Sequence, residues 1–357
     1  SFLVALHRES TVPQNEVTQG RGQNLDIKKF AALAGVAALT LAGCAAGTDS
    51  GAGETDSGAG ESAAAPANSD IKICVYTHGD GGTFWSVAQA GAEKAGEDLG
   101  ITIDYQGSTN DSARQAAIIE GAISANCDGV AASAPDPGAI EQAMLSLADA
   151  GIPTVTMNSG SSVFKDLGAF THVGQDEIVA GREAGLRFNE LGATNILCPI
   201  QEAANIGLTE RCQGARETFN GTVTDFNLDG GLQDLTAASA KIKAALEADP
   251  TIDAIFALNA DIAAKAALPA AQELGLDLHI GTVDMSEDAL NAIADGDMAF
   301  AIDQQQYAQG YLSVVLLYLN VTNAHALGGG LPMYTGPGFV DASNVEAVIG
   351  LVAAGTR

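Results

Sequence analysis

The sequence predicts an α/β fold with two doubly wound parallel-sheet lobes joined by a multi-strand hinge. Strand-like and helix-like segments alternate from residue 71 onward, which is typical of parallel sheets covered by helices. The strand candidates are also more numerous than the five or six usual in one sheet. Finally, β-rich sequence gives way to small polar residues at positions 157–162, which indicates a seam between two sheets.

The first strand, glycine loop and helix set the plan of the chain. Residues 71–76 are a β-rich apolar run, Gly79-Asp80-Gly81-Gly82 favours a turn, and a helical pattern runs from Phe84 to Leu99. A second strand candidate follows at once at 101–106, so the two strands should be parallel. Phe84 and Trp85, the only tryptophan, follow the first strand, and ligands bind beyond the carboxyl ends of such strands. We therefore expect these two rings to form one wall of a small-molecule cleft.

The remaining elements divide the chain into two lobes. A helix is predicted over 110–125, and further strand candidates lie at 128–133, 152–157, 195–200, 223–227, 253–258, 278–283 and 298–303. Residues 304–311 and 336–344 are placed to return the chain across the seam, so several crossings would bend as a hinge. The N-terminal lobe is predicted over 70–157 plus about 305–333, and the C-terminal lobe over 158–304 plus about 334–357.

The N-terminal part of the sequence has the features of an export signal. Lys28 and Lys29 precede an apolar run of export-signal length that ends in Leu41-Ala42-Gly43-Cys44, which resembles a bacterial lipobox. The resemblance implies a signal over 1–43, cleavage before Cys44 and lipidation of its thiol; a hydrophobic helix with a chance cysteine is the alternative. Residues 1–24 do not look like a signal, which a mis-assigned start codon would explain. Residues 44–69 are rich in Ala, Gly, Ser and acidic residues and predict a disordered tether to the membrane, outside the cytoplasm.

The charge balance excludes some partners. The formal net charge is -28, with 16 basic and 44 acidic residues. Nucleic acid requires clustered Lys and Arg, and anionic lipid attracts basic surfaces, so neither is expected to bind by charge.

Four cysteines remain beyond Cys44, and an oxidising compartment would allow them to pair. If the first strand neighbours the third, Cys74 and Cys127 lie at the starts of adjacent strands, whereas Cys198 and Cys212 are close in sequence. We predict these two pairs; four reduced thiols are the alternative. We expect no metal site, because the chain has no CxxC and no histidine at ligand spacing from a cysteine.

Motifs of cofactor binding and catalysis are absent from the sequence. In a dinucleotide fingerprint beginning at Gly79 the sixth position would be Phe84 instead of Gly, and this ring would block the close approach of helix and sheet. The chain has no P-loop, GxSxG or HExxH motif. We therefore expect no cofactor and no enzymatic activity.

Polar residues recur where predicted strands end. Asp136, Asn259, Asp284 and Gln304 each follow a β-rich run. Each alone could be a cap or turn residue, and Asp136 before Pro137 has the pattern of a helix N-cap. Together they favour a binding site, because the carboxyl ends of parallel strands share one rim.

On these residues the chain resembles the type I periplasmic sugar-binding proteins, the ribose- and galactose-binding group of ABC importers. The resemblance covers nearly all of residues 70–357. It is carried by Phe84, Trp85 and Gly91, by Ala134-Pro135-Asp136, by Arg211 and Gly214, by Asn259 and Asp284, and by Gln304 and Gly310.

The resemblance implies capture of a monosaccharide or similar polyol between the lobes of a monomer, and its delivery to a membrane permease. It assigns ligand contacts to Phe84, Trp85, Asp136, Arg211, Asn259, Asp284 and Gln304. Asn205 is a further candidate amide before Arg211, and His78 is a candidate from the glycine loop, where a turn residue is the alternative. A sensor that presents a sugar, furanone or cyclitol to a receptor is the alternative function.

Overall fold

The computed structural model describes residues 70–357. The predicted export signal at 1–43, the lipidation site Cys44 and the tether at 44–69 lie outside the described residues. Within residues 70–357, none of the helices combines the length and apolar character needed to cross a bilayer.

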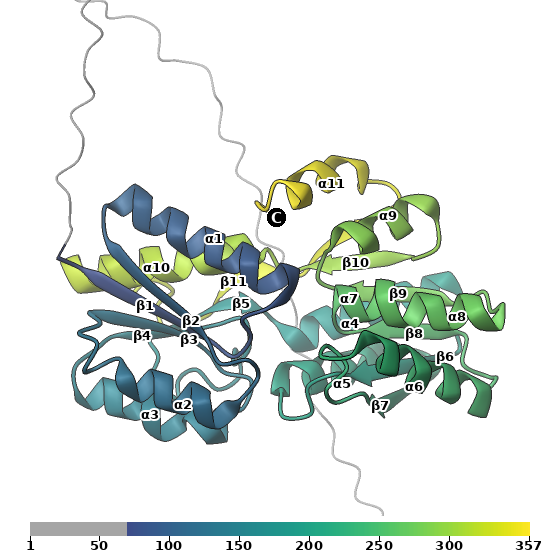
Figure 1. Ribbon diagram of the computed structural model, residues 1–357, viewed down its shortest axis with the longest axis horizontal. Helices are drawn as coiled ribbons and strands as arrows, with labels where there is room; N and C mark the ends of the chain where they lie inside the picture. Colours follow the sequence, from purple (N-terminus) through teal and green to yellow (C-terminus); the bar gives the residue numbers. More distant parts are fainter. Residues whose placement is uncertain (1–69) are drawn as a thin grey trace, which may run out of the picture. The chain divides into compact units, whose positions relative to one another are not determined.

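The first lobe is a six-stranded parallel sheet between two pairs of helices (Figure 1). Its strand order is β11-β5-β4-β3-β1-β2. The strands are β1 (Lys72–Thr77), β2 (Thr102–Gly107), β3 (Gly129–Ser133), β4 (Thr154–Met157), β5 (Thr171–Gln175) and β11 (Met333–Gly336). One face is covered by α1 (Gly82–Leu99) and α10 (Gln306–Asn323), and the other by α2 (Ser112–Gly121) and α3 (Pro137–Asp149).

The second lobe repeats this plan in a sheet of order β12-β10-β9-β8-β6-β7. Its strands are β6 (Asn195–Ile200), β7 (Thr222–Asn227), β8 (Ala254–Ala257), β9 (His279–Val283), β10 (Phe300–Asp303) and the antiparallel β12 (Gly338–Asp341). One face packs on α4 (Glu177–Leu191) and α5 (Ile206–Thr218). The other packs on α6 (Leu235–Ala248), α7 (Ala260–Ile262), a π-helical turn (Ala263–Ala267), α8 (Leu268–Leu274), α9 (Glu287–Asp295) and α11 (Glu346–Ala353).

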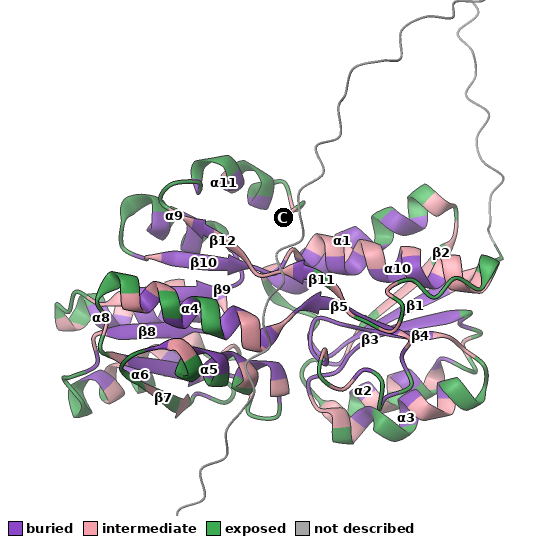
Figure 2. Ribbon diagram, turned by 180° about the vertical axis from the view of Figure 1, so that it is seen from behind, coloured by how far each residue is buried: buried purple, intermediate pink, exposed green. Residues whose placement is uncertain are grey.

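Burial follows the order of the strands. Every residue of the central strands β3 and β8 is buried, and both strands are composed of small and apolar residues (Figure 2). The edge strands β2 and β7 are only partly covered and contain polar residues such as Asp104 and Asp225. Parallel strands buried on both faces read as apolar runs, which is why the sequence predicted the central strands well.

The chain crosses between the lobes at three places, after β5, after β10 and between β11 and β12. The predicted lobe boundary after Met157 is therefore wrong, because β5, which was not predicted as a strand, pairs in parallel with β4 and keeps residues 158–175 in the first lobe. Likewise β11 pairs with β5, so the first lobe extends to Gly336 instead of ending near 333. The other two crossings lie within the segments predicted to return the chain.

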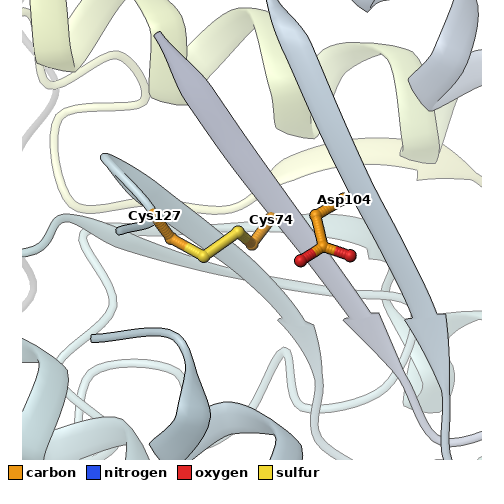
Figure 3. A group of neighbouring side chains, drawn as sticks. All are labelled: Cys74, Asp104 and Cys127. Carbon is orange, nitrogen blue, oxygen red and sulfur yellow. A yellow bond between two sulfur atoms is a disulfide. The ribbon is translucent and has the colours of Figure 1, made fainter. Parts of the chain in front are cut away.

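Both predicted disulfides are confirmed. Cys74 and Cys127 are bonded beside the edge of the first sheet, with Cα atoms 5.8 Å apart, and Asp104 of β2 lies next to them (Figure 3). Cys198 of β6 is bonded to Cys212 of α5, with Cα atoms 6.2 Å apart. Two groups of possible metal ligands lie in the described residues, Cys74–Asp104–Cys127 and Cys198–Cys212–Asp225. Within each group the two cysteines form a disulfide, so neither group offers a thiolate to a metal.

Each lobe contains one pair of helices in close contact through glycine. In the first lobe, a Cβ added to Gly310 of α10 would overlap the carbonyl oxygen of Ala88 in α1. In the second lobe, a Cβ added to Gly214 of α5 would overlap the carbonyl oxygen of Ile178 in α4. Gly310 and Gly214, which carried part of the family resemblance, are therefore packing positions.

We predict that the longer disulfide loop contributes more stability. The paired cysteines are 53 residues apart in the first lobe and 14 apart in the second. The entropy of loop closure then predicts losses of about 4 kcal/mol for Cys74→Ala/Cys127→Ala and about 3 kcal/mol for Cys198→Ala/Cys212→Ala. Urea unfolding of both double variants measures these losses; a larger loss for the shorter loop would contradict the prediction.

We also predict that Gly310→Ala destabilises the protein by about 1 to 3 kcal/mol, because the methyl group forces α1 and α10 apart. Gly350→Ala is the matched control, since Gly350 lies inside α11 with no atom near its added Cβ. The control should be neutral or stabilising by up to about 1 kcal/mol, as expected for Ala in a helix. Thermal unfolding compares the two variants, and equal effects would refute the packing role.

Candidate functional site

A cavity of about 270 Å³ lies between the two lobes and is lined by residues of both. Its walls come from the segments that follow β1, β2 and β4 in the first lobe and β6, β7, β8, β9 and β10 in the second. All of these segments start at the carboxyl ends of parallel strands, as expected for ligand sites in this fold class. A cavity of this volume suits a small solute.

The cavity contains all the predicted binding residues except one. His78, Phe84, Trp85, Asn205, Arg211, Asn259, Asp284 and Gln304 line it. Asp136 is not among the lining residues. Its side chain accepts a hydrogen bond from the Ala139 amide at 3.2 Å and caps α3. The assignment of Asp136 as a ligand carboxylate is therefore corrected to a helix cap, because Pro137 begins a helix directly after it.

The aromatic wall is built from one loop and the start of α1. Phe84 and Trp85 pack edge to face, with ring centroids 4.8 Å apart, and both are largely buried. His78 also packs edge to face against Trp85, at the same centroid distance. The indole occupies the space that a side chain at position 79 would need, so Gly79 is required for this packing.

Arg211 reaches the cavity from α5 and is held by an ion pair. Its Nε and Nη2 donate to the two carboxylate oxygens of Glu177 at 2.6 and 3.0 Å, and its Nη1 donates to the Leu258 carbonyl at 3.0 Å. Burial opposes the charge of Arg211, but Glu177 outweighs burial and raises the pKa of Arg211 above its usual value. Gln175 also donates to Glu177, at 2.7 Å. The guanidinium is thus fixed in one orientation.

Asp284 is a buried carboxylate held by two amides. Gln304 Nε2 donates to its Oδ1 at 2.5 Å, and Asn259 Nδ2 donates to its Oδ2 at 3.2 Å. Burial raises the pKa of Asp284 to about 6, although Arg211 and the amides act in the opposite direction. Its backbone has a φ of 71°. Ser286, and not Asp284, caps the following helix α9, so the Asp284 side chain can face the cavity.

Direct contacts between the lobes surround the cavity. The Ile206 amide donates to the Pro135 carbonyl at 2.9 Å, and Ser159 Oγ donates to Asn205 Oδ1 at 3.1 Å. His78 Nε2 lies 3.6 Å from Glu202 Oε2 across the gap. These contacts correspond to a closed arrangement of the lobes.

The structure adds polar lining residues that the sequence analysis did not select: Asp80, Asn110, Asn158, Gln201, Glu202 and Gln233. Gln201 and Glu202 directly follow β6, so the strand-end rule could have found them. Burial opposes the ionisation of Glu202, but hydrogen bonds from His78 and Asn205 and the charge of Arg211 outweigh it and lower the pKa of Glu202. Asn110 and Gln233 lie in longer loops, where sequence gives no comparable signal.

Comparison with known proteins identifies a family and several relatives. Residues 73–324 match the model of the periplasmic binding protein domain. The chain is 24% identical to the xylose/arabinose-binding protein of Sulfolobus acidocaldarius over 299 residues, 79% of this chain and 73% of that protein. It is 27% identical to the ribose import binding protein of Bacillus subtilis over 240 residues, 64% of this chain and 75% of that protein.

Solved structures show the same fold. A carbohydrate transporter of Acidothermus cellulolyticus 11B, in complex with myo-inositol, superposes with a TM-score of 0.77 at 38% identity and covers 80% of this chain and 99% of its own. An ABC transporter solute-binding protein of Bacillus halodurans C-125, with bound myo-inositol, has a TM-score of 0.67 at 22% identity, and the coverages are 79% and 98%.

We predict that Asp284 makes the protein less stable as the pH rises. Its pKa is about 6 when folded and 3.8 when unfolded, so the folded state keeps the proton longer and loses stability between about pH 4 and pH 7. Relative to Asp284→Asn, the wild type should lose up to about 3 kcal/mol over this range, from about 1.4 kcal/mol per pKa unit. Unfolding curves of both proteins at each pH, without ligand, measure the difference; a constant difference would contradict the prediction.

Proposed function

The chain belongs to the periplasmic binding protein family, and on this premise we propose that it captures a monosaccharide or a polyol of similar size between its lobes. We further propose that the closed form delivers this solute to the membrane permease of an ABC importer. The relatives are named as binding, import or transport proteins, which fits a role without catalysis.

The observation that carries the proposal is the composition of the interlobe cavity. Phe84 and Trp85 offer flat apolar surfaces, which suit the C–H faces of a sugar ring. Carboxylates, amides and the Arg211 guanidinium lie around them and can donate to or accept from hydroxyl groups. A small ring with hydroxyls around its edge matches both features.

The energetics are sufficient for useful affinity. A hydrogen bond to a charged group contributes about 1.5 to 3 kcal/mol. Micromolar binding requires about 8 kcal/mol, so a few such bonds together with ring packing can supply it after association costs are met. Because the solute contacts both lobes only when they are closed, it stabilises the closed form in proportion to its differential affinity.

Cyclitols deserve testing beside pentoses and hexoses. The related Acidothermus structure is described as a complex with myo-inositol, a six-membered ring with a hydroxyl on each carbon. The cavity volume and the ring of donors and acceptors are compatible with such a solute.

We also propose that a lipid at Cys44 anchors the protein to the outer side of the cell membrane. The support is the sequence Leu41-Ala42-Gly43-Cys44 after a basic and then apolar segment. One acyl chain binds a membrane only weakly, so a stable anchor requires more than one chain. Mass spectrometry of the mature N-terminus tests this proposal; an unmodified Cys44 in protein purified from its membrane would refute it.

We predict that Trp85 reports binding directly, because it is the only tryptophan and lines the cavity. Titration with pentoses, hexoses, polyols and cyclitols should change its fluorescence saturably for at least one solute. Phe84→Leu should then weaken the binding of that solute at least about tenfold, the equivalent of 1.4 kcal/mol, because a flat ring is lost.

Asp136→Ala is the matched control for this titration. It should lower stability by about 1 kcal/mol through the lost cap of α3, yet leave the affinity unchanged. If no compound of the panel binds, sugar or polyol capture is refuted.

A further inference from the structure

We infer that the cavity selects polyols bearing an ammonium group, as in an amino sugar or an aminocyclitol, which pairs with Glu202, and that it rejects anionic sugars. This inference rests on the proposed function and specifies its substrate class.

The charges around the cavity are predominantly negative. Asp80, Glu202, Asp261 and Asp284 line it. Among the described residues that line the cavity, Arg211 is the one lysine or arginine, and its charge is already paired with Glu177. Lys265 lies beside the cavity and pairs with Asp261 at 2.9 Å. The remaining carboxylates give the enclosed space a negative potential, which concentrates cations and repels anions.

Glu202 is the carboxylate best placed to bind a cation. Both oxygens of Asp284 already accept from Gln304 and Asn259, and Asp80 lies in an exposed loop, where it accepts from Thr109. Glu202 Oε2 accepts from Asn205 Nδ2 at 2.7 Å. For Glu202 Oε1, the described residues provide no hydrogen-bond donor, so this oxygen is open to a ligand. The depressed pKa of Glu202 keeps the group ionised at neutral pH.

A second observation also favours a donor-rich ligand. Gln201 lines the cavity and is almost fully buried, and its Oε1 has no hydrogen-bond partner among the described residues. A buried acceptor without a donor is unfavourable, so a ligand that donates at this position gains affinity. An ammonium group offers three donors and no acceptor, whereas a hydroxyl offers one donor.

Pairing with Glu202 favours ammonium over hydroxyl at the same ring position. A charge-assisted hydrogen bond is about twice as strong as a neutral one. The Glu202 side chain is only 17% exposed, so folding has already met most of the cost of desolvating its carboxylate. A carboxylate or phosphate on the ligand would instead enter a cavity lined by Glu202, Asp284 and Asp80.

The test compares ligands of one shape that differ in charge. Trp85 fluorescence at pH 7 measures the dissociation constants of D-glucose, D-glucosamine and D-glucuronate, and of myo-inositol beside an aminodeoxy-inositol. We expect the amine to bind at least about tenfold more tightly than its neutral counterpart in at least one series, and glucuronate to give no saturable signal. Added salt should reduce the preference for the amine, because it screens charge.

Glu202→Gln assigns the preference to this residue. The variant also affects closure through His78, but that effect applies to all ligands, so the ratio of amine to neutral affinity is the readout. We expect the ratio to fall to about one in Glu202→Gln. It should stay at the wild-type value in Glu247→Gln, which removes the same charge from the exposed side of α6.

Four results would overturn the inference. Equal binding of the amine and neutral partners by the wild type refutes the preference while leaving the proposed function intact, and so does tight binding of glucuronate. A ratio that persists in Glu202→Gln refutes the role of Glu202. Absence of binding in both series, together with the wider panel, overturns the proposed function and this inference with it.

Discussion

The direction of the strands is the constraint on which the molecule depends. In each sheet the carboxyl ends of the parallel strands lie at the same end of the sheet. The three crossings keep these two ends facing each other. Residues distant in sequence, such as Trp85, Arg211 and Asp284, therefore meet in one cavity. No single loop forms the site, so a solute can be enclosed only when both lobes take part.

Some groups of the site are held in place by the surrounding fold, whereas others lower the stability of the folded protein. Glu177 has no described role at the cavity wall; it holds Arg211, and Gln175 at the end of β5 holds Glu177. Asp284, in contrast, is more readily ionised in water than in its buried position. Breaking a buried ion pair by removing one partner typically costs about 3 to 5 kcal/mol, so Glu177 is as important to the site as the guanidinium it orients.

The sequence predicted the fold, and eight of the nine binding residues selected from it line the cavity, for a common physical reason. Buried parallel strands are apolar and end abruptly in polar residues, so both β8 and the following Asn259 were predictable. β5 was missed because His172, Gly174 and Gln175 lack the β-rich apolar pattern. Asp136 and Asp284 follow strands in the same way. Asp136 caps the helix that begins at Pro137. Asp284 has a positive φ, and Ser286 caps the helix that follows it, so the Asp284 side chain can line the cavity. Such backbone angles cannot be read from one sequence.

The two disulfides each join residues of the same lobe, and neither crosses the hinge. Oxidation therefore stiffens each half separately and leaves their rotation against each other unrestricted by covalent bonds. A thiol reductant should therefore make each lobe easier to unfold and to cleave by proteases. It should not change the covalent connection between the two lobes. The covalent bonds that resist unfolding are thus separate from the three chain crossings that connect the lobes.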